Sequence, residues 1–421
     1  MTTDKKPLRV GLIGFGCVGQ GFYDIVRQQP TLGLTVTRIA VKTPDKLRPL
    51  LPHHFSFRAD DLLDDPDLDV LVEVIDDPDE AYRLVRAALL RGRRIVTANK
   101  ALVARHLAEL VELQREFGGT LLYEAAVCGS IPIVRTLDDY FSHEPLRRVT
   151  GILNGSSNYV LTRMREAGTG YGAALAEAQA QGFAETDPAL DMAAFDPRSK
   201  AVILAAHAFG VFLDPDDVLN LGIEAIDAAD VAYAAQRGQR IKVVAHLQRL
   251  PNGRVAALVT PQLLGPESAL YGVDYEFNGV VVEAEFAGTQ FLRGRGAGGH
   301  PTGSAVLADV LALRRGYRYG YAKYASASAP QPAAQLKIDC YLRHPNATHL
   351  RAVLSKLGVC EKATVVVSAD GAHVEVAVAV AQLRNHRDAL RAAGVFVARQ
   401  GDVRAVEALP KRAEAVAAVA A

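Results

Sequence analysis

Short apolar runs alternate with amphipathic stretches over the first 124 residues of the chain. Runs of about four to eight apolar residues are typical of buried strands, whereas apolar residues three or four apart are typical of helices. The predicted strands cover 8–13, 34–41, 70–75, 94–97 and 120–124, and the predicted helices begin at Phe22 and cover 80–91 and 104–117. Strands that alternate with helices indicate an α/β Rossmann-type domain, a parallel sheet covered by helices.

The pattern changes after about residue 130. Predicted helices come first, at 158–166, 172–181, 196–209 and 228–237. Apolar strands follow at 241–250, 254–260, 279–286 and 290–295, and a helix over 302–315 closes this part. Helices grouped before strands predict an α+β domain.

The last part of the chain has a third pattern. It predicts a strand at 336–342, a helix at 347–357, strands at 363–368 and 374–380, a helix at 382–393 and a strand at 394–399. This βαββαβ order is ferredoxin-like. We therefore expect a first domain over 1–130 completed by 300–324, a second over 131–299, a small-residue linker at 325–334 and a third domain over 335–421.

Composition narrows the functional classes. The 421 residues include 47 basic and 47 acidic side chains, and this balance argues against a nucleic-acid binder or a polybasic membrane protein. No uncharged apolar run approaches the roughly 20 residues of a membrane helix. Four dispersed cysteines without a CxxC pair exclude a disulfide scaffold and a zinc ribbon, and they favour a cytoplasmic protein. The expected partner is a small molecule.

A glycine-rich motif follows the first predicted strand. Gly14, Gly16 and Gly19 form GxGxxG between a strand and a helix, which is the context that dinucleotide binding requires. The diphosphate of a nucleotide would lie at the helix N-terminus, where free N–H groups favour an anion. The cofactor residues predicted from this turn are Gly14, Phe15, Gly16, Cys17, Val18 and Gly19. A tight turn without a ligand is the alternative.

The end of the second predicted strand bears on cofactor choice. An acidic residue there would bind the ribose hydroxyls of NAD. This chain has Lys42 instead, with Lys46 and Arg48 nearby, and we expect Lys42 to accommodate the 2′-phosphate of NADP, with NAD as a possible substitute. An exposed loop lysine without a ligand is the alternative.

Three polar stretches supply candidate chemistry. Thr97 and Lys100 directly follow a strand of the predicted parallel sheet, and ligands bind at the carboxyl ends of such strands. The stretch 154–158 (NGSSN) is polar and opens a helix. Asp196 and Lys200 are four residues apart on a helix that is apolar nearly all round. A surface ion pair is the ordinary explanation, but a lysine on a buried helix needs a partner and indicates function.

Six stretches of the sequence, which include the glycine-rich turn and the three polar stretches, together resemble the homoserine dehydrogenase family. They are GLIGFGCVG, IVTANKALVA, YEAAVCGSIPIV, GILNGSSNYVLTRM, GFAETDPALDMAAFDPRSKAVILA and GRGAGGHPTGSAV, in the family's order over about residues 8–320. The resemblance implies interconversion of L-aspartate-4-semialdehyde and L-homoserine with NAD(P)(H), in threonine and methionine biosynthesis. It also implies that the second domain serves catalysis and dimerisation, in a homodimer or homotetramer.

The resemblance also implies roles for single residues. Lys200 corresponds to the lysine that donates the proton to the aldehyde oxygen, and Lys100 to a second active-site lysine. The implied substrate-binding acids are Glu185, Asp191 and Asp196, and the implied positions near the cofactor are Gly182 and Gly298. An implied sodium site consists of Glu124 and the carbonyl groups of Val127, Gly129 and Ile131.

Two departures from the family pattern stand out. Asp76 and Asp77 replace the usual Gly-Gly after the third predicted strand, and acids that faced the cofactor would repel its phosphates. The last domain has the order of an ACT regulatory domain, but its first loop is 343–346 (RHPN) and lacks the usual glycine. We therefore expect weak or no inhibition by threonine, and a role of this ACT-like domain in assembly through its sheet edge.

Two other functions remain open at this point. Another amino-acid semialdehyde oxidoreductase, such as aspartate-semialdehyde dehydrogenase, would need a nucleophilic cysteine with a histidine partner, and Cys128 has no obvious base beside it. A non-catalytic regulator that senses NADP would be favoured by loss of Lys100 or Lys200, but both lysines are present.

Overall fold

The computed structural model describes residues 6–44, 46–325, 330–359 and 363–406. Its first part contains a six-stranded parallel sheet in the order β3-β2-β1-β4-β5-β6. The strands are β1 (Leu8–Ile13), β2 (Leu34–Ala40), β3 (Phe55–Ser56), β4 (Val70–Glu73), β5 (Arg94–Thr97) and β6 (Thr120–Leu122). This order is that of doubly wound dinucleotide-binding folds, in which ligands bind beyond the carboxyl ends of the strands. The predicted Rossmann-type sheet is confirmed.

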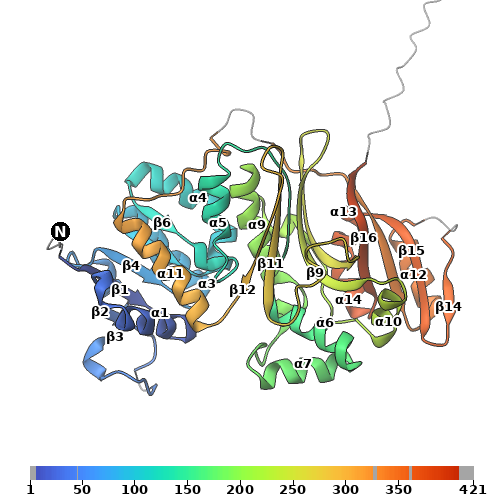
Figure 1. Ribbon diagram of the computed structural model, residues 1–421, viewed down its shortest axis with the longest axis horizontal. Coiled ribbons are helices and arrows are strands. Elements are labelled where there is room, and N and C mark those ends of the chain that lie inside the picture. Colours follow the sequence, from blue (N-terminus) through green and yellow to red (C-terminus); the bar gives the residue numbers. More distant parts are fainter. Residues whose placement is uncertain (1–5, 45, 326–329, 360–362, 407–421) are drawn as a thin grey trace, which may run out of the picture.

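Helices cover the parallel sheet, and one of them comes from much later in the chain. They are α1 (Cys17–Gln28), α2 (Asp60–Leu63), α3 (Pro78–Leu90), α4 (Lys100–Phe117) and α11 (Gly299–Arg314). Helix α11 packs along α1, as the orange and blue ribbons of Figure 1 show. Close packing is possible because Gly303 faces the backbone of Phe22, where an added methyl group would lie 3.0 Å from its Cα.

A second, mixed sheet forms the rest of the molecule. Its order is β12-β11-β7-β9-β10-β16-β13-β15-β14, with β8 beside β10. The strands before the C-terminal segment are β7 (Leu146–Ile152), β8 (Leu219–Asn220), β9 (Arg240–Arg249), β10 (Val255–Leu264), β11 (Phe277–Ala284) and β12 (Thr289–Arg295). The sequence pattern missed β7, since Arg147 and Arg148 interrupt its apolar run. Arg148 forms an ion pair with Glu283 of β11, and this pair offsets the cost of placing a charged side chain in the sheet.

Six helices belong to residues 131–240 of this part. They are α5 (Ile133–Arg135), α6 (Gly155–Ala167), α7 (Tyr171–Ala180), α8 (Ala189–Met192), α9 (Phe195–Phe209) and α10 (Ala228–Gln236). Short helical turns are η1 (Pro30–Leu32), η2 (Pro52–His54), η3 (Glu124–Ala126), η4 (Thr136–Tyr140) and η5 (Pro215–Asp217). Helix α9 packs against α4 on one side and against β9 and β10 on the other. The helix is therefore buried on nearly all of its faces, as the sequence predicted.

The C-terminal segment has the predicted strand and helix order. Its elements are β13 (Leu336–His344), α12 (Ala347–Lys356), β14 (Val366–Ser368), β15 (Gly371–Ala379), α13 (Val380–Asn385), α14 (Arg387–Ala392) and β16 (Phe396–Ala405). We call these residues, 336–405, the C-terminal unit. The single helix predicted over 382–393 is split at His386, and the last strand is longer than expected.

The C-terminal unit continues the second sheet instead of standing apart. Strand β16 lies beside β10, where Gln262 pairs with Arg399. Side chains of the unit share one apolar cluster with Leu219, Leu221, Leu250, Ala256 and Leu258. Arg343 of β13 donates to Asp230 of α10 at 2.7 Å, and both side chains are buried. The valine-rich strands of the unit need an apolar surface to cover them. The rest of the same chain provides part of that surface.

Some sequence predictions concern residues that the structure does not describe. Residues 326–329 of the predicted linker, Cys360 and residues 407–421 lie outside the described residues. The domain boundaries near 130, 299 and 334 stay predictions. Among the described helices, none combines the length and apolar character needed to cross a membrane.

Candidate active site

The glycine-rich turn is built for a close approach to an anion. Gly14 has φ +102°, and a methyl group there would lie 2.8 Å from the carbonyl oxygen of Val74. Gly19 lies directly against the Gly14 carbonyl, so any side chain there would separate α1 from β1. Gly16, the N-cap of α1, has no side chain to bond the first N–H groups of the helix. These donors suit the diphosphate of a dinucleotide.

Two other segments that the sequence assigned to the cofactor lie beside this turn. Gly298 is the N-cap of α11, and the next residue, Gly299, packs on Cys17, where an added methyl group would lie 2.8 Å from the Cys17 carbonyl oxygen. Lys42 is exposed just past the end of β2.

Asp77 caps α3 by accepting from the N–H groups of Asp79 and Glu80. Its carboxylate is therefore engaged by the helix, and Asp76 beside it is exposed.

A buried glutamate at the end of β4 organises the segment that carries Lys100. Glu73 accepts from the N–H of Ile75 at 2.7 Å and from the hydroxyl of Thr97. The Thr97 hydroxyl oxygen in turn accepts from the N–H of Asn99 at 3.0 Å, and Asn99 caps α4, whose first residue is Lys100. Burial raises the pKa of Glu73 to about 7. Glu73 was not predicted from the sequence, although an acid inside an apolar run was a visible signal.

The centre of the candidate site is one carboxylate between two lysines. The Nζ of Lys200 donates to Oδ2 of Asp196 at 2.7 Å, and the Nζ of Lys100 lies 2.9 Å from Oδ1. Lys200 also donates to the carbonyl of Leu153 at 2.8 Å. The side chain of Lys200 is 10% exposed and that of Lys100 is 41% exposed. The two lysines come from different helices, Lys100 from α4 and Lys200 from α9, and meet at Asp196.

An asparagine from the 154–158 stretch links two acids of the site. The Nδ2 of Asn154 donates to Asp196 at 2.8 Å and to Asp191 at 2.7 Å. Its Oδ1 accepts from the N–H and the hydroxyl of Ser157, which fixes the orientation of the amide. Asn154 was not among the predicted site residues, and its place in the polar stretch before α6 was the available signal.

The charges at this centre determine its protonation. Burial alone would raise the pKa of Asp196, but the ammonium groups of Lys100 and Lys200 outweigh burial and hold that pKa well below its usual range. Asp196 in turn raises the pKa of Lys100. Burial, together with the charge of Asp196, raises the pKa of Asp191. The centre is therefore an ionised carboxylate with a protonated lysine, Lys100, beside it.

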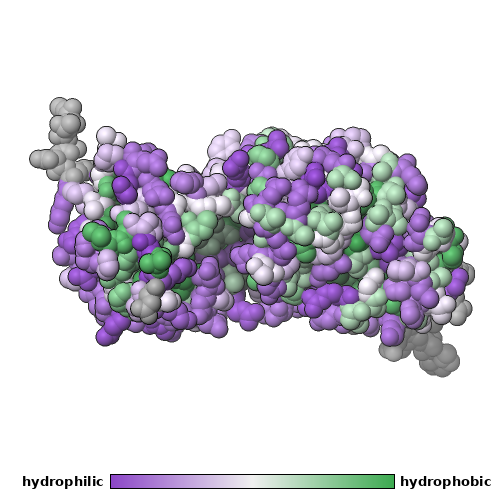
Figure 2. Space-filling view, turned by 90° about the horizontal axis from the view of Figure 1, so that it is seen from below, coloured by the Kyte–Doolittle hydropathy of each residue, from purple (hydrophilic) through white to green (hydrophobic). Residues whose placement is uncertain are grey.

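The remaining predicted substrate and cofactor residues lie on the segment between α7 and α8. Glu185 is exposed, and its negative charge contributes to raising the pKa of Lys100. Gln179 donates to the backbone carbonyls of Glu185 and Thr186, which ties the segment to α7. Gly182 is exposed just after α7. Figure 2 shows a hollow between the part of the molecule with the parallel sheet and the part with the second sheet.

The predicted sodium residues follow β6. Both carboxylate oxygens of Glu124 accept backbone N–H groups, from Val134 and Arg135, at 2.8 Å. Burial raises the pKa of Glu124 to about 8, with a contribution from the nearby carboxyl group of Asp309. No N–H group in the described part of the chain donates to the carbonyl of Val127 or Gly129, whereas the carbonyl of Ile131 accepts from Ile133.

The cysteine within this segment lacks the properties of a nucleophile. Cys128 is fully buried, and burial raises the pKa of its thiol to about 12. A nucleophilic cysteine needs a stabilised thiolate. The thiol mechanism considered above is therefore not supported.

The parallel sheet, the glycine-rich turn and the lysines beside it define a class, the nicotinamide-nucleotide oxidoreductases. The family model for the "Homoserine dehydrogenase, NAD binding domain" matches residues 14–124, and the "Homoserine dehydrogenase" model matches residues 132–311. The chain belongs to the homoserine dehydrogenase family. It is an enzyme that interconverts L-homoserine and L-aspartate-4-semialdehyde with a nicotinamide cofactor, as the sequence analysis predicted.

Individual relatives agree with this assignment. The homoserine dehydrogenase of Corynebacterium glutamicum is 39% identical over 326 residues, which are 74% of this chain and 73% of the relative. That of Bacillus subtilis is 35% identical and covers 75% of each chain. The solved homoserine dehydrogenase of Thiobacillus denitrificans has a TM-score of 0.79 at 29% identity and covers 94% of this chain and 99% of its own. A hyperthermophilic archaeal homoserine dehydrogenase, solved in complex with NADPH, has a TM-score of 0.62 at 25% identity, with coverage of 74% and 99%.

The raised pKa of Glu73 predicts a pH-dependent stability. The folded protein keeps this proton up to about pH 7, whereas the unfolded chain releases it near the ordinary value of 4.5. The stabilisation is therefore complete below about pH 4.5 and is lost as pH rises through 7. We expect Glu73→Gln to remove this slope, so that its free energy of unfolding gains up to about 3 kcal/mol relative to the unmodified protein between about pH 5 and pH 8. Denaturant unfolding across this range measures the difference.

The exposed Glu116 offers a matched control on α4. Glu116→Gln should leave the pH dependence of stability unchanged. Parallel curves for Glu73→Gln and the unmodified protein would show that Glu73 titrates normally.

Proposed function

We propose that Lys200 transfers the proton of the reaction at the substrate oxygen. When bound, the reduced nicotinamide supplies the hydride that attacks the aldehyde carbon. As the C=O π bond breaks, the oxygen takes a proton from the Nζ of Lys200 and the hydroxyl of homoserine forms. In the opposite direction Lys200 removes this proton. The shared carboxylate of Asp196 is the observation that carries the proposal, because it holds Lys200 in one geometry.

The hydrogen bonds of Lys200 are consistent with this role. An ammonium group has three N–H donors. Asp196 and the Leu153 carbonyl accept two of them, which leaves one for the substrate oxygen. Lys100 adds a second positive charge beside the same carboxylate, and this charge would stabilise negative charge that develops on the oxygen.

The acids around this centre suit the amino-acid end of the substrate. The substrate carries an ammonium group, which carboxylates bind. We assign this task to Glu185 and Asp191, since Glu185 is exposed and close enough to influence Lys100, and Asp191 is held in place by Asn154. Gly182 and Gly298 would leave room for the cofactor beside the same region.

We infer that the cofactor is NADP, bound along the glycine-rich turn from Gly14 to Gly19 and past Thr97. The support is the cation that follows β2, where an enzyme specific for NAD has an acid. Lys42 is exposed there, and Arg48 donates to the carbonyl of Thr43, which keeps a second cation at the same strand end.

We also propose a sodium site after β6. The carbonyl groups of Val127 and Gly129 are free of N–H donors within the described residues, and hard cations take such oxygens. Glu124 and the Ile131 carbonyl would complete the set. Sodium bound there would stabilise the loop that connects the two sheets.

For the C-terminal unit we propose an ACT-like fold with a role in assembly. Its strand order, β16-β13-β15-β14, supports this, and the outer strand β14 has exposed Val366 and Val367 that a second copy could cover in a homodimer or homotetramer. The first loop is filled by its own side chains, because Asn346 caps α12 and His344 contacts the carbonyl of Ala393.

A cytoplasmic location is consistent with the free thiols of Cys17, Cys128 and Cys340.

Lys200→Met should lower kcat by at least about 100-fold in both directions, which is the usual contribution of general acid–base catalysis. Affinity for NADPH, measured by fluorescence titration, should change by less than about two-fold, because the role of Lys200 is confined to the substrate oxygen. Lys337→Met, at an exposed lysine of β13, serves as the control. Turnover of Lys200→Met near that of the control would exclude Lys200 as the proton donor.

Lys42→Ala should raise the KM for NADP about ten-fold and leave the KM for NAD nearly unchanged, since only NADP carries the phosphate that Lys42 would contact. The neighbouring exposed Lys46 provides a matched control, and Lys46→Ala should affect both cofactors little. Equal losses for the two cofactors would contradict the NADP assignment.

A further inference from the structure

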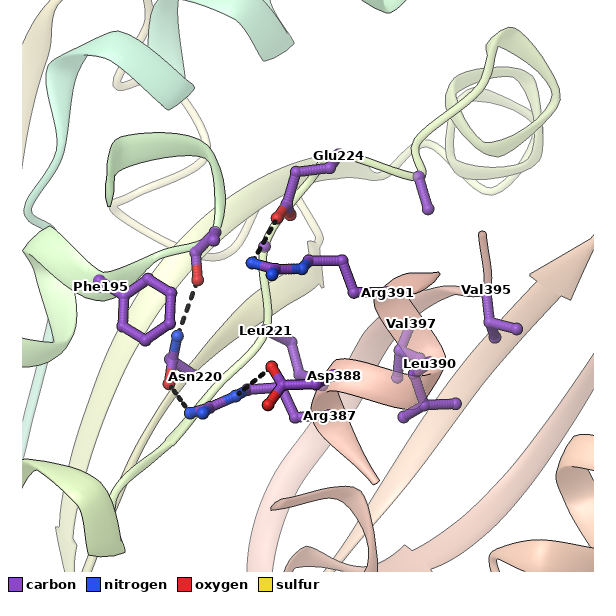
Figure 3. A pocket seen from close by; sticks show the side chains of 13 residues that line it. Phe195, Asn220, Leu221, Glu224, Arg387, Asp388, Leu390, Arg391, Val395 and Val397 are labelled. Carbon is purple, nitrogen blue, oxygen red and sulfur yellow. Dashed lines mark hydrogen bonds and ion pairs between the residues drawn. The ribbon is translucent and has the colours of Figure 1, made fainter. Parts of the chain in front are cut away.

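The C-terminal unit meets the catalytic part of the chain close to Asp196. Figure 3 shows the small pocket at this junction, with Phe195 and Asn220 on one side and Arg387 and Arg391 of α14 on the other. Phe195 begins α9 and directly precedes Asp196. The pocket therefore adjoins the first turn of the helix that carries both Asp196 and Lys200.

The backbone just before this helix is strained. Ala194, the N-cap of α9, has φ +62° and ψ +27°, which is the left-handed region. Residues with a Cβ rarely adopt this conformation, and it persists only where the surroundings hold it. Asp196 lies two residues further along, so the direction of this turn determines where its carboxylate lies.

A buried asparagine holds the strained turn. Asn220, at the end of β8, is fully buried, and its Nδ2 donates to the carbonyl of Ala193 at 2.8 Å. Its Oδ1 accepts from Arg387 of the C-terminal unit at 2.6 Å. The weaker second donor to this oxygen is Arg198, at 3.4 Å. Arg387 thus holds the side-chain amide of Asn220, and this amide holds the turn at Ala193 and Ala194. Figure 3 draws both hydrogen bonds.

The same arginine also contacts the residue before Asp196 directly. The guanidinium carbon of Arg387 lies 5.3 Å from the centroid of the Phe195 ring, and that of Arg198 lies 4.9 Å from it. Guanidinium groups at this distance are attracted to the face of an aromatic ring. Phe195 is therefore held by one cation from its own helix and one from the C-terminal unit.

We propose that Arg387 is a positioning residue of the active site, which acts through Asn220 and Phe195 to hold Asp196 between Lys100 and Lys200. The proposal rests on the function proposed above for Lys200 and Asp196. It assigns the C-terminal unit an indirect part in the chemical step, through the position of Asp196, separate from any role in assembly. Without Arg387 the turn at Ala194 relaxes, and the carboxylate no longer orients the two ammonium groups.

The test compares two arginines of the same short helix in the full-length enzyme. Arg387→Ala should lower kcat for homoserine oxidation about ten-fold, because small displacements of catalytic groups are costly. The KM for NADP should stay within about two-fold, since the glycine-rich turn is remote from α14. Within the described residues, the ion pair of the Arg391 side chain is a long contact with Glu224, at 3.8 Å, and this side chain is 51% exposed. Arg391→Ala should therefore keep kcat within about two-fold of the unmodified enzyme.

Arg387→Lys provides a variant that keeps the charge and a donor for Asn220 but loses the planar group over Phe195. We expect it to recover part of kcat, and circular dichroism should show that all three variants are folded. Equal kcat for Arg387→Ala and Arg391→Ala, or a lower melting temperature for Arg387→Ala without a change in kcat, would overturn the proposal. Full activity of Lys200→Met would instead overturn the proposed function, so the two failures are distinguishable.

Discussion

The attraction of two ammonium groups to one buried carboxylate is the interaction on which this site depends. Asp196 lies between Lys100, which begins a helix on the parallel sheet, and Lys200, one turn along its own helix. Taking the charges of Asp196 and Lys200 out of water is costly unless their geometry is good and further hydrogen bonds are present. Asn154 and the Leu153 carbonyl supply those bonds. Loss of Asp196 would leave the buried ammonium group of Lys200 without its carboxylate partner.

This requirement explains why the site draws on the whole chain. Helix α9 is buried between α4 on one side and β9 and β10 on the other, and this burial takes Lys200 and Asp196 out of water. The segment with Lys100 is held by Glu73 and Thr97, and Glu73 pairs with Ile13 beside the cofactor turn. The turn before Asp196 is held by Asn220. The cofactor sheet, the second sheet and the C-terminal unit thus converge on one carboxylate.

Local features were predictable from the sequence, and features made by contacts between distant segments were not. The glycine-rich turn and the helix of Lys200 follow from spacing, because a strand, a turn and a helical periodicity are local. The resemblance to the family put Lys100, Asp196 and Lys200 in one site. Spacing alone could not bring Lys100 to Asp196, since that contact joins two helices that are far apart in the sequence, α4 and α9. Strand β7 was missed because two arginines interrupt it, and the importance of Asn220 appears only when the packing of the C-terminal unit is known.

A double-mutant cycle on kcat/KM for homoserine tests the central claim most directly. If Asp196 acts only by holding Lys200, the losses caused by Asp196→Asn and Lys200→Met should not multiply, because groups that act as one unit are not additive. The account predicts that the double variant is within about three-fold of the slower single variant. Independent effects, in which the two fold-losses multiply in the double variant, would contradict it.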